Sequence, residues 1–178
     1  IALGFGFPFY GEPRDSVSVG SDGWLSFTAT SGANGNQRLP TPGEPDALLA
    51  LLWDDLDPSA GGTVLVHADA EAGRFVAQWN EVPHYRYGGG GEPVTCQAIL
   101  AADGTIRYQY RTVADEQGCS VGIEDDAGAR GLEVVFNGPY LRDGLAVEFR
   151  PLPPVDWARL EPATGALEPG LNHATTLH

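Results

Sequence analysis

Large apolar residues recur at every second position in many short segments of the chain, which is the period of an extended strand. Residues 1–11 begin this pattern, with Leu3, Phe5, Phe7 and Phe9 on one face. Shorter alternating segments follow, each bounded by Gly, Asp or Pro, and the strands expected from them are 16–20, 24–27, 63–68, 74–79, 94–100, 105–110, 120–124, 132–136 and 145–149. Short strands at spacings near ten residues predict an all-β fold, an antiparallel β-sandwich of about ten short strands.

One apolar segment, residues 47–53 (ALLALLW), does not alternate. It fits either a short helix of about one and a half turns or a strand buried on both faces. We favour the buried strand, because seven residues are few for a helix and the segment lies between Pro45 and Asp54. Residues 28–46, rich in Gly, Pro, Asn, Ser and Thr, are expected to form a long surface loop.

The pattern divides the chain into three parts. Residues 1–150 form the β-sandwich module, residues 151–154 (PLPP) a stiff Pro-rich linker, and residues 155–178 two strands joined by a turn. Two strands cannot bury a core of their own. Because the chain also starts inside an apolar strand, residues 155–178 are expected to pack on a neighbouring copy as a donor-strand extension and to build a filament. The alternative is that the chain ends do not follow natural boundaries.

The charge of the chain excludes one class of partner. Asp and Glu total 24 against ten Arg and no Lys, which gives a net charge of −14. Nucleic-acid binding requires a basic surface, so no nucleic-acid partner is expected. No membrane insertion is expected either, because no apolar segment approaches the roughly 20 residues of a spanning helix. The expected partners are copies of the chain itself or neighbouring domains of a parent protein.

Six segments, in the same order, resemble the nidogen-like β-rich module of large secreted bacterial surface proteins. They are FPFYG (7–11), SDGWLSF (21–27), LLWDDLDP (51–58), FVAQWNEVPHY (75–85), QAILAADGTIRYQY (97–110) and SVGIED (120–125). The resemblance implies an extracellular or cell-surface location and a non-catalytic role among adhesion and surface domains. Residues 155–178 resemble the opening strands of a bacterial immunoglobulin-like domain, through Trp157, then Pro162-x-x-Gly165, then Pro169-Gly170.

The densest carboxylate cluster, Asp54, Asp55 and Asp57, is a candidate Ca²⁺ site. It follows the buried apolar segment directly, and calcium takes 6–8 oxygen ligands in irregular geometry. The spacing is not that of an EF-hand. The alternative is a solvated acidic turn started by Asp57-Pro58. A second cluster, Glu124-Asp125-Asp126, is expected to form a plain hairpin turn.

A second candidate site is the aromatic loop that contains His84, Tyr85 and Tyr87. It lies beside four successive glycines, residues 88–91, and aromatic faces stack on sugars and protein surfaces. This loop supports the alternative function of a carbohydrate- or protein-binding accessory module of a secreted enzyme or adhesin. Trp79, which precedes the loop, is either part of this contact or part of the core.

The two cysteines, Cys96 and Cys119, are candidates for one disulfide. If the strands at 94–100, 105–110 and 120–124 form a simple meander, the outer two lie about 9.6 Å apart, beyond the limit of about 7 Å between bonded Cα atoms. A disulfide therefore requires a fold-back of the loop before Cys119 or a different strand order, and the sequence leaves both open.

The sequence shows no pattern typical of an enzyme. A Gly-x-Ser-x-Gly nucleophile motif is missing, and the four His have no metal-ligand spacing. Cys96 lies within an apolar strand, where a reactive thiolate is unfavourable. Together with the role that the resemblance to the nidogen-like module implies, this makes a non-catalytic extracellular structural module the expected function.

Overall fold

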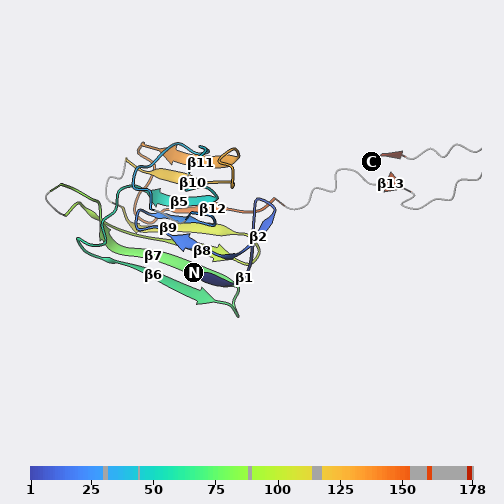
Figure 1. The fold of residues 1–178 in the computed structure, drawn as a ribbon, viewed down its shortest axis with the longest axis horizontal. Helices are drawn as coiled ribbons and strands as arrows, with labels where there is room; N and C mark the ends of the chain where they lie inside the picture. The colour runs from blue at the N-terminus through green and yellow to red at the C-terminus, as the bar shows by residue number, and fades with distance from the viewer. Residues whose placement is uncertain are drawn as a thin grey trace, which may run out of the picture.

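The computed structural model describes residues 1–29, 32–43, 45–87, 90–113, 118–152, 160–161 and 176–177. Every regular element within these residues is a β-strand, and each pairing is antiparallel (Figure 1). The strands form two five-stranded sheets and two separate two-stranded pairs. The sequence prediction of an all-β antiparallel sandwich is confirmed.

Two sheets build the sandwich, and each is named here after one of its strands. The β5 sheet has the strand order β11 (Gly131–Phe136), β10 (Ser120–Glu124), β5 (Leu48–Trp53), β4 (Trp24–Ser26) and β3 (Ser18–Val19). The β7 sheet has the order β12 (Ala146–Phe149), β9 (Ile106–Thr112), β8 (Pro93–Ala101), β7 (Arg74–Pro83) and β6 (Thr63–Asp69). A separate pair at the chain start joins β1 (Ala2–Phe9) to β2 (Glu12–Ser16).

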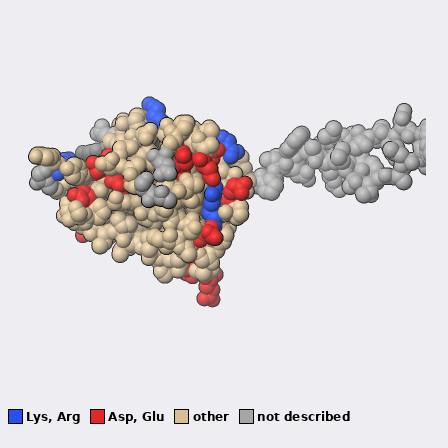
Figure 2. Space-filling view, in the orientation of Figure 1, with Lys and Arg blue, Asp and Glu red and all other residues tan. Residues whose placement is uncertain are grey.

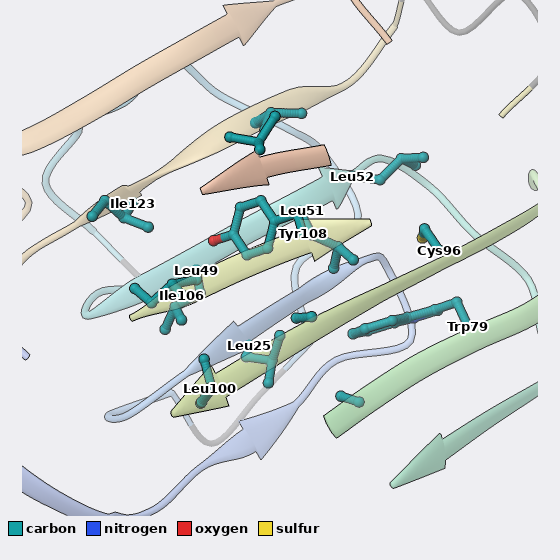
Figure 3. Packing of buried hydrophobic residues seen from close by; sticks show 14 of the residues in the cluster. Leu25, Leu49, Leu51, Leu52, Trp79, Cys96, Leu100, Ile106, Tyr108 and Ile123 are labelled. Atoms are coloured by element: carbon teal, nitrogen blue, oxygen red, sulfur yellow. The ribbon is translucent and has the colours of Figure 1, made fainter. Parts of the chain in front are cut away.

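The main core lies between the sheets and collects the alternating apolar residues expected from the sequence. Leu49 and Leu51 of β5 pack in the same cluster as Tyr108 of β9 and Trp79 of β7 (Figure 3). Leu3, Phe7 and Phe9 of β1 join this cluster from one side, as their shared face predicts. Burying side chains of this size supplies most of the driving force for folding.

β5 is buried along its whole length, which confirms the buried strand predicted over residues 47–53. Its second face is covered by the described residues between 28 and 46, which we call the strap. Leu39 and Ala29 of the strap pack in a second cluster with Leu48, Ala50 and Trp53 of β5 and with Trp24. The expectation of a plain surface loop is therefore incomplete, because the strap has its own buried side.

The predictions for residues 155–178 lie largely outside the described residues. Within that segment the structure describes only the pairing of β13 (Leu160–Glu161) with β14 (Thr176–Leu177). Among the described residues, no helix is long and apolar enough to cross a membrane.

Candidate functional site

The two predicted sites, the aspartate cluster and the aromatic loop, lie side by side in the structure. The segment after β5 runs along the end of β7, where the Asp57 N–H donates to the Pro83 carbonyl at 2.8 Å. The Tyr85 N–H donates to the Asp55 carbonyl at 2.7 Å, and Leu56 forms an antiparallel bridge with His84. We call residues 54–57 and 83–87 together the loop site. Two predictions made separately from the sequence thus describe one region.

A side-chain pair joins the two halves of the loop site. His84 Nδ1 lies 2.9 Å from Asp54 Oδ2, and both side chains are partly buried. Since an ionised carboxylate can only accept a hydrogen bond, Nδ1 carries the proton and donates it to Asp54. This bond fixes the orientation of the imidazole and holds the aromatic loop against the segment that follows β5.

The carboxylate of Asp57 is engaged within its own turn. Its Oδ1 accepts hydrogen bonds from the Ser59 N–H at 3.0 Å and from the Ser59 hydroxyl at 2.5 Å. This is the turn-starting geometry that Asp-Pro sequences favour. Across the described parts of the chain, no group of three or more His, Cys, Asp or Glu side chains is placed so that it could hold a metal ion. Calcium binding at Asp54, Asp55 and Asp57 stays a prediction.

Asp22, which the sequence analysis did not single out, stabilises the loop site through a hydrogen bond from the backbone of Leu56. Its buried carboxylate accepts the Leu56 N–H at 3.3 Å through Oδ1 and the Ser21 hydroxyl at 2.7 Å through Oδ2. Burial raises the pKa of this carboxyl above its ordinary value. The sequence Ser21-Asp22-Gly23 is typical of a turn, but no local signal shows that residues 54–57 pack against it.

The aromatic residues of the region divide into two groups. Tyr87 is fully exposed and Tyr85 is 53% exposed, so both rings are available to a ligand. Trp79 is completely buried, and its indole N–H donates to the Ser21 carbonyl at 2.8 Å. Trp79 is therefore part of the core and not part of the aromatic contact, the two alternatives that the sequence left open.

Cys96 and Cys119, both within the described residues, are not joined by a disulfide in the structure. The simple meander is wrong, because the chain leaves the β7 sheet after β9 and enters the β5 sheet at β10. Both side chains are buried in the main core. Burial raises the pKa of the Cys96 thiol to about 12, which opposes formation of a reactive thiolate.

The second acidic cluster differs from the plain hairpin turn expected for it. Asp125 does sit at a turn, where Arg130 and two backbone N–H groups hold the pKa of its carboxyl well below the ordinary range. Glu124, however, is completely buried at the end of β10. Its Oε2 accepts the Thr41 N–H of the strap at 2.8 Å, and its Oε1 has no hydrogen-bond partner in the described structure. Burial raises the pKa of Glu124 to about 7.

The comparison with protein families gives a match. A family model with the description NIDO related matches residues 1–142, a range that contains the loop site, the strap and both cysteines. The search of curated proteins returned no match. The search of solved structures likewise returned none.

Proposed function

The chain belongs to the NIDO-related family, and from this membership we propose that it is a non-catalytic extracellular structural module. Domains of this family occur in extracellular proteins. The supporting observation in the structure is that polar groups of the loop site are bonded to one another or to neighbouring residues of the module. Asp54 bonds to His84, Asp57 to Ser59, and Asp22 to the backbone of Leu56. These bonds stabilise the end of the sandwich.

The state of the buried thiol also supports a non-catalytic role. A catalytic cysteine needs a lowered pKa and an accessible sulfur. Cys96 has the opposite properties, since it is buried and its pKa is raised.

Digestion of intact cells that carry the natural parent protein tests the proposed location. Trypsin cleaves after arginine, and the ten arginines of this chain include the exposed Arg38 and Arg74. We expect peptides from residues 1–150 to be released before lysis. A cytoplasmic protein from the same cells serves as the control for leakage. Release of the module peptides only together with that control would contradict an extracellular location.

We further propose that the module is a subunit of a surface filament assembled through residues 155–178. This proposal rests on the sequence pattern of that segment. Removal of residues 155–178 is expected to convert an assembling chain into one that does not polymerise, as measured by light scattering and negative-stain microscopy. Polymerisation of the shortened chain, or a full chain that never polymerises, would contradict it.

A second candidate function is carbohydrate or protein binding at the loop site. The observation that favours it is the exposure of Tyr85 and Tyr87 on a loop anchored by the Asp54–His84 bond. A glycan array with the intact chain, Tyr85→Ala and Tyr87→Ala tests it. Selective binding that both variants lose, and that the variant Tyr140→Ala at another exposed tyrosine keeps, would support the accessory-module function. Binding unaffected by either substitution would exclude the loop site.

A further inference from the structure

β6 is the edge strand of the β7 sheet. Within the described chain it pairs with β7 alone, in an unbroken register from Thr63 opposite Asn80 to Asp69 opposite Arg74. It is seven residues long and has no bulge. An edge of this kind presents a row of unpaired backbone N–H and C=O groups that can pair with another strand.

The other edges of the two sheets have features that oppose strand addition. β3 has only two residues. β11 contains Glu133, and its register with β10 is shifted by an irregularity. β12 has four residues and contains Glu148, which pairs with Arg107 and Arg150. Short length, charge and bulges are the usual protections of an edge.

β6 has none of these protections over most of its length. Residues 63–68 include no Asp, Glu or Arg, in a chain with 24 acidic residues. Figure 2 shows the lower rim of the molecule, where β6 runs in Figure 1, as largely uncharged, with acidic atoms gathered at its tip. β1 contacts both β6 and β7, and Gly4 of β1 faces Ala70 in the turn that joins them.

The core is also incomplete at this edge. The register places Val64, Val66 and Ala68 opposite the buried residues Trp79, Ala77 and Phe75, so these three side chains share the inner face of the sheet. Val66 is nevertheless 45% exposed, and Ala68 is exposed. Leu65, on the outer face, is 52% exposed. An added strand would cover apolar surface on both faces.

We propose that β6 pairs with β6 of a second copy of this chain, antiparallel, about a two-fold axis at Val66. In this register Val66 lies opposite Val66 and Val64 opposite Ala68. The inner-face residues therefore form apolar cross-strand pairs. Leu65 lies opposite His67, and Thr63 opposite Asp69. No pair brings two carboxylates together. The two β7 sheets become one continuous sheet, and the isologous contact closes at two copies.

The distribution of charge permits a second copy to approach this edge. With a net charge of −14 on each chain, copies repel wherever their carboxylates meet. The row from Thr63 to Ala68 contains no carboxylate, so two backbones can approach closely there without that cost. The strand is therefore self-complementary in polarity, in charge and in hydrogen bonding.

The mass of the 178-residue chain, measured by light scattering over a wide concentration range, is the first test. As concentration increases, we expect the first associated species to have twice the monomer mass of 18.8 kDa. Val66→Lys places two ammonium groups opposite each other and should remove this dimeric species. Leu132→Lys, at a 58% exposed leucine on β11, is the matched control and should still dimerise.

A charge exchange tests the register. Val66→Lys and Val66→Glu should each lack the β6 dimer alone and should form a heterodimer when mixed, because lysine then lies opposite glutamate. Circular dichroism checks that both variants fold. A monomeric parent chain at all concentrations, a dimer that survives Val66→Lys, or an equal loss in Leu132→Lys would overturn the proposal. Failure of the mixture to associate would overturn the register.

This inference is independent of the filament proposal, and the two are separable. Removal of residues 155–178 should leave the β6 dimer intact and abolish only open-ended polymers. Loss of the dimer on this removal would contradict pairing through β6.

Discussion

Trp24 and Trp53 donate their indole N–H groups to the same acceptor, the carbonyl oxygen of Ala33, at 3.0 and 2.9 Å. One tryptophan belongs to β4 and the other to the end of β5, while Ala33 belongs to the strap. This shared acceptor fixes the strap over the second face of the β5 sheet.

Replacing both tryptophans should lower the free energy of unfolding by more than the sum of the two single replacements. Trp24→Phe or Trp53→Phe alone leaves the Ala33 carbonyl one donor, and we expect each to lower the free energy of unfolding by about 1–2 kcal/mol. The double variant leaves that carbonyl with neither donor and should cost more than the sum. Urea unfolding followed by circular dichroism measures this. Trp79→Phe is the control, because the Trp79 N–H has a different acceptor. Its loss of unfolding free energy should add to that of Trp24→Phe or Trp53→Phe without coupling.

Glu124 should make stability fall as pH rises. Its pKa in the folded state, about 7, lies above its ordinary value of 4.5, so the folded state holds the extra proton between these values. The free energy of unfolding should therefore decrease by roughly 1–3 kcal/mol from pH 4.5 to pH 7. Asp125 has a lowered pKa, so its contribution to the free energy of unfolding is lost only as the pH falls below 3.8.

Denaturant titrations at several pH values measure this decrease. Glu124→Gln should flatten the slope between pH 4.5 and 7. Glu133→Gln is the matched control, because Glu133 also accepts a strap N–H, that of Leu39. A slope unchanged in Glu124→Gln would show that another group is responsible.

Calcium removal tests the prediction at Asp54, Asp55 and Asp57. If a cation occupies the loop site at a hundredfold excess over its Kd, it adds about 2.7 kcal/mol to the free energy of unfolding. Melting of the calcium-loaded chain should then shift downward with chelator, and Asp55→Asn should reduce the shift. Identical midpoints with and without chelator, after loading is verified, would end the calcium prediction.

Cys96 should be unreactive until the chain unfolds. Its burial and its raised pKa both oppose thiolate formation, so alkylation at pH 8 should be much slower in the native state than in denaturant. Mass spectrometry after unfolding without reductant should find alkyl groups on both Cys96 and Cys119. A mass that shows no alkylation under these conditions would instead demonstrate a disulfide.

The strands of the module could be predicted from sequence because alternation records which face is buried. The Phe7 and Phe9 face of β1 and the apolar run of β5 both lie where the pattern places them. The sequence did not predict β2, because Glu12–Ser16 is polar on both faces and, among the described strands, pairs with β1 alone. A strand of that kind is stabilised by backbone hydrogen bonds and has no buried face. Its sequence therefore shows no alternation of apolar residues.

The candidate site was only partly predictable. The residues Asp54, His84 and Tyr85 were identified, but their proximity depends on two segments far apart in sequence. The burial of Glu124 was also missed, because the strap that covers it is rich in residues typical of exposed loops. Local composition does not reveal which surface a loop packs on.

The crossing of the chain between sheets after β9 has a consequence for the order of folding. β6, β7, β8 and β9 follow one another as neighbouring hairpins, whereas β10 must insert between β5 and β11. Contacts between near neighbours in sequence form before distant ones, because closing long loops costs more entropy. The β6–β9 meander should therefore be the nucleus, and the docking of β5 against β10 the slow event. A nascent chain would then expose the β6 edge before the strap has closed.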